Sequence, residues 1–497
     1  MDRLFKSTFI VSSCTLISRI FGYLRDMVIA DKLGAGGLND AFVAAFRLAN
    51  VFRNIFAEGA LNVVFVPEFS QILKTSGKKQ AFIFAAKVHS LLLVVLAIFC
   101  LLAIIMMPEI IWYTTPGFRE DTYIYNLAVL FGRITFPYLF CISLAAFYGG
   151  ILNTFNKFFP FAIAPALLNI ISVIGLCFFD QCETSAHTLS MATLIGGVFE
   201  LAWMIYFLFK HGCKLSIVKF KLDSKITRVL KNMLPIVVAS GVTHINACIS
   251  MIVLSYFPGG LSYMYYADRI VQLPLALIGT AIGTVLLPML AKTLVSKQKN
   301  TSLEIQNGAI SLVMFLAIPA TAALLFLGHD IIEVLFERGN FPHSATIQTA
   351  KTLMLLSIGL PAFVLIKLFQ TQFYSKLNTK LPVVIAIISI CINLIISLLT
   401  MNSLQYLGVA VANSVSGWVN FILLLVFAKK NLGFNFYPNT LMKGGKYVVA
   451  SVVMVLVMWG IASALPMPNK YLFLGLEITV GLLTYLISCY LWSNVLR

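Results

Sequence analysis

Residues 18–58 read SRIFGYLRDMVIADKLGAGGLNDAFVAAFRLANVFRNIFAE and determine how the rest of the chain is interpreted. Apolar residues flank the charges on both sides, so the stretch differs from an ordinary surface loop. A charged side chain at the centre of a membrane helix costs about 2.5–3.5 kcal/mol. A chain that keeps several there must pair them with acids, line a wet cavity with them, or bind a charged molecule. The basic residues are Arg19, Arg25, Lys32, Arg47 and Arg53, and the acids are Asp26, Asp31, Asp40 and Glu58.

The whole chain has the composition of a polytopic membrane protein. Of its 497 residues, 60% are hydrophobic and 11% are charged, whereas a soluble domain has about 25% charged residues. The net charge of +17 would suggest nucleic acid for a soluble protein, but the basic residues concentrate in alternate connectors, as the positive-inside rule expects. The nine cysteines show no spacing typical of disulfides or zinc. We therefore expect no nucleic-acid partner, no metal site and no cofactor.

Apolar runs of about 20 residues, the length that crosses a bilayer, predict about fourteen membrane-spanning α-helices. Basic connectors follow the even-numbered spans, and acidic or nearly neutral connectors follow the odd-numbered ones. This alternation predicts that both termini are cytoplasmic. The predicted spans are 6–30, 39–73, 80–107, 122–152, 158–179, 188–209, 226–256, 260–294, 302–327, 345–375, 381–401, 404–428, 441–465 and 471–492.

An internal repeat links the two halves of the chain. Three sequence landmarks recur at nearly one offset, which predicts a repeat of six spans. Because six is even, both copies enter the membrane in the same direction and form a parallel repeat. We expect an N-terminal lobe (1–210), a basic cytoplasmic linker (211–225), a C-terminal lobe (226–430), a central cavity between the lobes, and two additional helices (431–497). The landmark pairs are Pro67 and Pro288 (288 − 67 = 221), Pro137 and Pro361 (361 − 137 = 224), and Asn153 and Asn378 (378 − 153 = 225).

Each of the first two predicted spans carries a polar stripe. At about 100° per residue, Arg19 and Asp26 lie on one face of the first helix. Asp40, Arg47 and Glu58 lie on one face of the second, if that helix is continuous. A cluster of arginines suits phosphate, because the guanidinium group forms bidentate, charge-assisted hydrogen bonds and stays ionised when partly desolvated. The stripes therefore favour an anionic, phosphorylated substrate.

The second half adds Asp268 and Arg269 early in the span 260–294, at the level where the repeat places Arg47. One interpretation is a basic cavity lined by both lobes. The other is structural: the acids of the first two spans hold the arginines in salt bridges, and Asp268 pairs with Arg269 at a helix end. Glycines within 34–37 allow a tight reversal between the first two helices.

Signatures of enzymes are missing from the sequence. It contains no H-E-x-x-H, G-x-S-x-G or P-loop motif. A membrane enzyme that acts on a polyprenyl phosphate would need a base or a metal cluster near a membrane face, and none is visible. We therefore expect a transporter rather than an enzyme.

Several longer motifs resemble those of the MurJ (MviN) lipid II flippases, and the resemblance covers nearly the whole chain. This family belongs to the multidrug/oligosaccharidyl-lipid/polysaccharide exporter superfamily. The resemblance implies a multi-pass protein of the bacterial inner membrane that moves lipid-linked peptidoglycan precursor to the outer leaflet by alternating access. The motifs are SRIFGYLRD (18–26), LGAGGLNDAF (33–42), FRLANVFRNIFAEGALNVVFVPEF (46–69), MYYADRI (264–270), IGTAIGTVLLPML (278–290) and LFERGNF (335–341).

The resemblance also implies roles for individual residues. The cavity arginines that bind the diphosphate would be Arg19, Arg25, Arg53 and Arg269, and the accompanying polar residues would be Asp26, Asp40, Asn50, Glu58 and Ser262. The two additional helices would form a groove for the lipid tail. The sequence departs from the family pattern at two positions: Ala49 replaces an expected proline, and Gln272 replaces an expected acid.

The implied partners are lipid II, membrane lipids and the cell-wall synthesis machinery. Coupling to the membrane potential or to a monovalent cation stays unassigned. The alternative function is the export of drugs or of another lipid-linked oligosaccharide by the same architecture.

Overall fold

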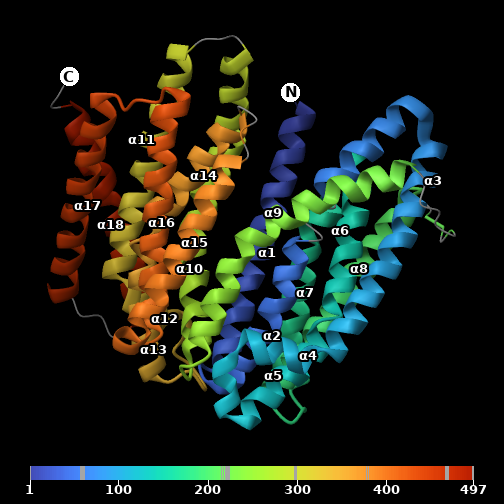
Figure 1. The fold of residues 1–497 in the computed structure, drawn as a ribbon. Coiled ribbons are helices and arrows are strands. Elements are labelled where there is room, and N and C mark those ends of the chain that lie inside the picture. Colours follow the sequence, from blue (N-terminus) through green and yellow to red (C-terminus); the bar gives the residue numbers. More distant parts are fainter. Residues whose placement is uncertain are drawn as a thin grey trace. The chain divides into compact units, whose positions relative to one another are not determined.

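The computed structural model describes residues 2–55, 62–213, 215–216, 218, 224–295, 299–375, 378, 380–464 and 469–494 (Figure 1). Within these ranges the regular structure is entirely helical. The helices are α1 (Asp2–Leu33), α2 (Gly37–Arg53), α3 (Asn62–Ile105), α4 (Met107–Thr114), η2 (Pro116–Glu120), α5 (Thr122–Thr135), α6 (Tyr138–Thr154), α7 (Phe159–Phe178), α8 (Ser185–Lys210), α9 (Ser224–Leu254), α10 (Gly260–Val295), α11 (Lys299–Phe326), α12 (Gly328–Phe336), α13 (His343–Ser357), α14 (Leu360–Ser375), α15 (Lys380–Leu404), α16 (Leu407–Phe427), η3 (Ala428–Leu432), α17 (Pro438–Ala464) and α18 (Lys470–Asn494).

Each of the fourteen predicted spans coincides with one or two of these helices. In the described part of the chain, nine helices are long and apolar enough to cross a membrane, and the bent pair α13–α14 makes ten. The other predicted spans coincide with α1, with α2 and the start of α3, with α9 and with α10. The predicted all-α polytopic fold is therefore confirmed.

The structure breaks two predicted spans that the apolar pattern treats as continuous. The span 122–152 divides into α5 and α6 at Pro137, and 345–375 divides into α13 and α14 before Pro361. Proline lacks an N–H donor and is accommodated at the start of a helix, so each break falls where a new helix begins. The short helices α4 and α12 and the turn η2 lie between spans, and the sequence did not predict them.

The helices confirm the internal repeat. From α4 to α8, each helix has a counterpart from α12 to α16 that begins 221 or 222 residues later; for example, α4 begins at residue 107 and α12 at residue 328 (328 − 107 = 221). The pair α1 and α9 shows the same offset. Helices α17 and α18 follow the repeat and pack against each other.

The chain divides into two compact units. Unit 1 comprises Met1–Ser262 together with Arg338–Phe341, and unit 2 comprises Tyr263–Glu337 and Pro342–Arg497. Unit 1 therefore includes α9, which belongs to the C-terminal lobe in the sequence prediction, and a four-residue loop from the second repeat. The two units are described separately below.

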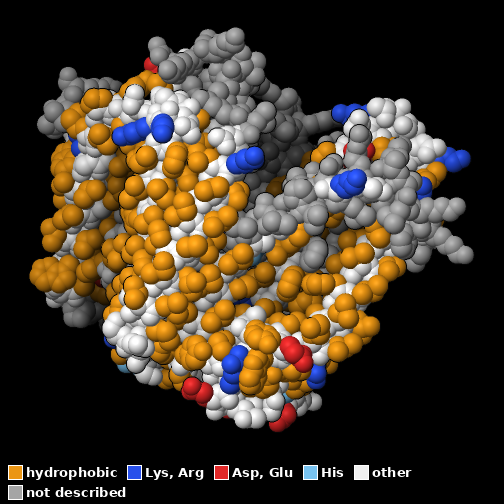
Figure 2. Space-filling model, viewed as in Figure 1, with side chains coloured by type: hydrophobic (Ala, Val, Ile, Leu, Met, Phe, Trp, Pro, Cys, Tyr) orange, Lys and Arg blue, Asp and Glu red, His pale blue; other side chains and the backbone are white. Residues whose placement is uncertain are grey.

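The surfaces of both units are apolar over the middle of their helices. In Figure 2, hydrophobic side chains cover these helices, and charged side chains lie mainly near the helix ends. Large apolar residues such as Trp459, Leu456 and Leu482 are more than half exposed. The interior of unit 1 contains packed aromatic rings, including Phe65 and Phe147 with centroids 4.6 Å apart. An apolar exterior around a packed core is typical of a protein that faces lipid.

Candidate functional site

The most buried charges of the predicted site are Arg25 and Asp26 on α1. Their exposed fractions are 6% and 2%. Asp26 Oδ1 accepts hydrogen bonds from Arg25 Nη2 at 2.9 Å and from Arg25 Nε at 3.2 Å. The Arg25 guanidinium carbon also lies 5.8 Å from the ring centroid of Phe46 on α2. Asp26 therefore holds the Arg25 guanidinium in place through a salt bridge within α1.

The other basic residues of α1 and α2 are less enclosed. Arg19 is partly exposed, and no acidic group of the described residues lies within 4.0 Å of it. Arg47 and Arg53 are also partly exposed, and Arg53 Nη2 donates to Asn54 Oδ1 at 3.1 Å. Asn50 donates from its side chain to the carbonyl of Phe46 on its own helix at 3.0 Å. Helix α2 ends at Arg53, and Glu58 lies outside the described residues.

Asp40 has a different role from the predicted one of holding an arginine. Its buried carboxylate accepts hydrogen bonds from the backbone N–H of Gly259 (2.6 Å), the backbone N–H of Ser262 (2.8 Å) and the Ser262 hydroxyl (2.6 Å). The first N–H groups of a helix have no partner within the helix, and a carboxylate at this end is favourable. Asp40 on α2 therefore caps the start of α10, where Ser262 is fully buried.

The turn between α1 and α2 receives the loop 338–341 of the second repeat, within unit 1. Asn340 donates from its backbone to Asp31 O at 2.8 Å and from its side chain to Lys32 O at 2.7 Å. Gly34, with φ of +67°, makes this approach possible, because a Cβ there would lie 2.1 Å from Asn340 O. Of the glycines predicted to reverse the chain here, Gly34 adopts the left-handed conformation and Gly36 is extended.

The same arrangement occurs a second time in unit 1. The backbone N–H of Gly117 in η2 donates to the Ser255 hydroxyl at 3.0 Å, directly after α9. A Cβ on Gly117 would lie 2.3 Å from the Ser255 backbone, just as a Cβ on Gly339 would lie 2.4 Å from Asp31 O. Gly117 and Gly339 are 222 residues apart, and Asp31 and Ser255 are 224 apart, which are the offsets of the repeat. We call these two contacts the paired loop contacts.

Glu200 is a buried acid that the sequence analysis missed. It lies in the middle of α8 with no exposed surface, and neither of its carboxylate oxygens has a hydrogen-bond partner among the described residues. It interacts electrostatically with Arg53 and with Tyr138. The sequence pattern that could have revealed Glu200 is a single acidic residue within an apolar helix. Ionisable residues at such positions are often functional in membrane proteins.

In unit 2, α10 carries Asp268 and Arg269. The Arg269 guanidinium carbon lies 5.0 Å from the Tyr265 ring centroid, and its Nη2 donates to the Tyr265 hydroxyl at 3.3 Å. Asp268 Oδ2 accepts a hydrogen bond from Gln272 Nε2 at 2.5 Å. An acid at position 272 would repel Asp268 one turn away, whereas the amide donates to it. The departure from the expected residue thus has a local physical reason.

The predicted site is therefore distributed over both units. Unit 1 holds the arginine–acid pair and the capped start of α10, and unit 2 holds Arg269 on Tyr265. The convergence of Arg19, Arg25, Arg53 and Arg269 on one cavity stays a prediction. The lipid-tail groove at residues 431–497 stays a prediction as well.

Comparison with known proteins gives consistent matches over the whole chain. The family of the lipid II flippase MurJ matches residues 29–476. A probable lipid II flippase MurJ of Rickettsia prowazekii (strain Madrid E) is 38% identical over 427 residues, which are 86% of this chain and 84% of the relative. The protein of the same description from Rhizobium tropici is 38% identical over 429 residues, 85% of this chain and 80% of its own.

Solved structures agree with these relatives. A lipid II flippase MurJ in an inward closed conformation has a TM-score of 0.83 and 27% sequence identity, and the match covers 98% of this chain and 100% of that one. An inward-facing multidrug transporter of the MATE family shares the fold, with a TM-score of 0.70 at 15% identity. These matches confirm the predicted transporter class and a multi-pass protein of the bacterial inner membrane. The chain belongs to the MurJ family of lipid II flippases.

Proposed function

We propose that this protein translocates lipid II, the lipid-linked peptidoglycan precursor, from the cytoplasmic to the outer leaflet. Translocation proceeds by alternating access, with both termini in the cytoplasm. The diphosphate of the head group binds to Arg19, Arg25, Arg53 and Arg269. Asp26, Asn50 and Glu58 support these arginines, and the lipid tail follows the groove of the two C-terminal helices.

The observation that carries the proposal is the number of arginines on α1 and α2 within an apolar scaffold: Arg19, Arg25, Arg47 and Arg53. Asp26 forms a salt bridge with Arg25, whereas the carboxylate of Asp40 is directed at Gly259 and Ser262 and not at an arginine. Guanidinium groups in an apolar scaffold attract anions, because low-dielectric walls focus the field.

The paired loop contacts supply the conformational part of the proposal. By loop charge, they lie on the outer side of the membrane. For this side to open, Asn340 leaves Asp31 and Lys32, Gly117 leaves Ser255, and Asp40 releases Gly259 and Ser262. The hydrogen bonds of the paired loop contacts are neutral, at about 0.5–1.5 kcal/mol each, whereas those to the Asp40 carboxylate are charge-assisted, at about 1.5–3 kcal/mol each. Contacts of this size permit an equilibrium between closed and open states, which alternating access requires.

The test is translocation in cells that depend on this protein. Lipid II on the outer leaflet is measured by its cleavage with an externally added enzyme, at matched membrane levels of each variant. We expect Arg25→Ala and Arg269→Ala to slow translocation about 10-fold or more, because a hydrogen bond to a charged group is worth about 1.5–3 kcal/mol.

Arg133→Ala is the matched control. Arg133 is an exposed arginine at the end of α5 that donates to the carbonyl of Ile104, and its loss should leave translocation unchanged. Normal translocation in both test variants would exclude the arginine site. If the variants change the drug resistance of the cells but leave lipid II export normal, a drug exporter is favoured instead.

A further inference from the structure

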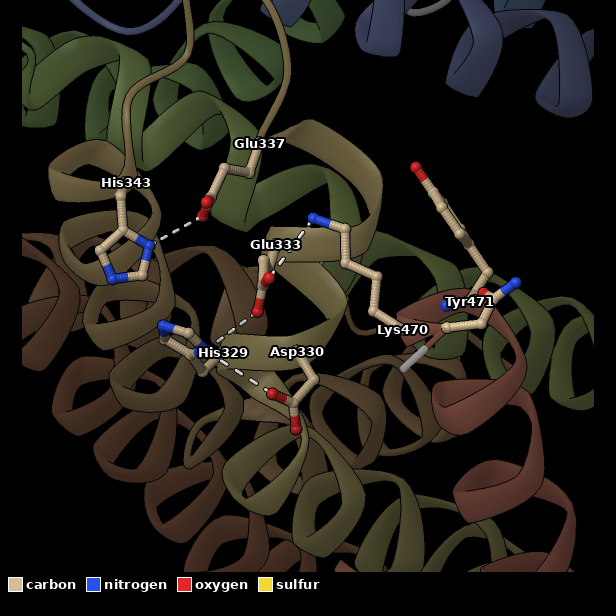
Figure 3. Close-up of polar contacts among 8 residues, drawn as sticks. His329, Asp330, Glu333, Glu337, His343, Lys470 and Tyr471 are labelled. Atoms are coloured by element: carbon tan, nitrogen blue, oxygen red, sulfur yellow. Dashed lines mark hydrogen bonds and ion pairs between the residues drawn. The ribbon is translucent and has the colours of Figure 1, made fainter. Parts of the chain in front are cut away.

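A compact group of ionisable side chains occupies the start of α12 in unit 2, away from the predicted arginine site. His329, Asp330 and Glu333 are half-buried, and each offers one ligand atom such that all three atoms lie within 4.8 Å of one another. His329 Nδ1 lies 3.6 Å from Asp330 Oδ1 and 3.9 Å from Glu333 Oε2 (Figure 3). Helical spacing explains the arrangement, because residues i and i+4 lie on the same face.

These distances suit a shared metal ion better than direct hydrogen bonds. Hydrogen bonds between nitrogen and oxygen measure about 2.7–3.2 Å. Two ligands bound to one zinc ion at about 2.0–2.2 Å, in tetrahedral geometry, lie roughly 3.4 Å apart. Small side-chain adjustments of His329, Asp330 and Glu333 would therefore bring all three atoms onto one ion.

Helix α18 contributes a second, independent observation. Glu477 is only 1% exposed, and its Oε2 has no hydrogen-bond partner among the described residues. It lies seven residues, or about two turns, after Lys470 and therefore on the same face of α18. Lys470 Nζ contacts Glu333 Oε1 at 3.3 Å, so this face is directed at α12. Glu477 and Asp330 interact electrostatically, so the buried carboxylate lies within electrostatic range of the cluster.

The charge of the group calls for a divalent cation. When Asp330, Glu333 and Glu477 are all ionised and His329 is neutral, their three negative charges and the positive charge of Lys470 sum to −2. The contact with Lys470 uses Glu333 Oε1, and Oε2 remains directed at His329. Nearby His343 is engaged by Glu337 at 3.0 Å and is not needed as a ligand (Figure 3).

We propose that His329, Asp330 and Glu333 form a binding site for a divalent transition-metal ion, with Glu477 as the fourth ligand or as a hydrogen-bonding partner of a ligand. Mixed imidazole and carboxylate ligands are typical of zinc, so Zn²⁺ is the ion to test. The bound ion joins α12 to α18 and so fixes the C-terminal helix against α12 within unit 2. The site does not depend on the proposed substrate.

The test is titration of the purified full-length protein, without a histidine tag and stripped of metal, with ZnCl₂ by isothermal calorimetry. We expect one Zn²⁺ per chain. His329→Gln and Asp330→Asn should each weaken binding more than 10-fold, and Glu477→Gln should weaken it about 10- to 100-fold, the range for outer-shell partners. Lys470→Met should strengthen binding, because it removes a repelling charge.

His187 provides the matched control. It lies 3.9 Å from Glu183 at the same i,i+4 spacing but with a single acid, so His187→Gln should bind Zn²⁺ like the wild type. The wild-type protein should also unfold at a higher temperature with Zn²⁺, since a ligand of the native state stabilises it. Absence of saturable binding in the wild type, or equal affinity in His329→Gln, would overturn the proposal. A cluster that only forms ion pairs would lose thermal stability in Lys470→Met and would not bind Zn²⁺.

Discussion

The substitution Gly34→Ala isolates the contact between the α1–α2 turn and the loop 338–341. Gly34 has φ of +67°, where a non-glycine residue costs about 1–2 kcal/mol. The new Cβ would also lie 2.1 Å from Asn340 O, and overpacking of this kind costs about 1–3 kcal/mol. Only the overpacking cost, about 1–3 kcal/mol, is relieved if the loop leaves, because the positive φ belongs to the turn itself. Departure breaks the two hydrogen bonds of Asn340, at about 1–3 kcal/mol together. The two costs are similar, so we expect the undocked loop to become substantially populated.

Gly212→Ala is the control that measures the cost of an alanine at positive φ without any steric contact. Gly212 has nearly the same φ, +68°, but nothing lies within 4 Å of its Cβ position. It should therefore cost only the backbone term of about 1–2 kcal/mol. The difference between the two variants in the population of the undocked loop measures the effect of the Cβ on the docking of the loop 338–341.

The assay is limited trypsin digestion of the purified protein in detergent, with the site of cleavage identified by mass spectrometry. Cleavage after Arg338 reports the undocked loop, and a change of about 1–3 kcal/mol in opening raises its population about 5- to 150-fold. Cleavage after Arg119, in the equivalent loop of the first repeat, is the internal reference. Equal cleavage after Arg338 in Gly34→Ala and Gly212→Ala would refute the reasoning.

Three further predictions concern single side chains. Asp40→Asn should destabilise unit 1 by about 1–3 kcal/mol, because one buried N–H or hydroxyl donor at the start of α10 loses its acceptor. The measurement is the unfolding temperature, which should fall. An unchanged unfolding temperature would contradict the capping role of Asp40. Gln272→Glu should destabilise α10 locally and speed its amide hydrogen exchange, because it replaces a hydrogen bond to Asp268 with repulsion. Unchanged amide exchange around Asp268 would argue against the interaction between Gln272 and Asp268. In a Cys177→Ser background, exposed Cys182, between α7 and α8, should react with an impermeant maleimide from outside the inner membrane. Adding Cys182→Ser should remove that labelling, and reaction only from the cytoplasmic side would contradict the predicted topology.

Much of the fold follows from the sequence, because a membrane imposes a simple rule. A helix that crosses lipid must be long and apolar, and every predicted span coincides with one or two helices in the part of the chain that the structure describes. The repeat was detectable because Pro137 and Pro361 mark the same break in each half. The short helices α4 and α12 were missed because eight or nine residues are too few for a periodic apolar pattern to be recognised.

The site was harder to derive, since contacts between distant residues leave little trace in one sequence. Salt bridging among these charges was predictable in general, but helical spacing placed Asp26 on one face with Arg19, whereas the structure pairs Asp26 with the adjacent Arg25. The binding of Asp40 to Gly259 and Ser262 was not predictable, because it joins residues about 220 positions apart. Gly117 and Gly339 looked like ordinary loop glycines until the structure showed the backbone that each one contacts.

The central claim is that Arg19, Arg25, Arg53 and Arg269 bind the diphosphate of the lipid substrate. Its most direct measurement is the affinity of purified wild-type and Arg25→Ala protein for lipid II, and for a polyprenyl lipid with the same tail but no phosphate. The account predicts that Arg25→Ala weakens lipid II binding about 10-fold or more and leaves binding of the phosphate-free lipid unchanged. Equal affinity of both proteins for lipid II would contradict it.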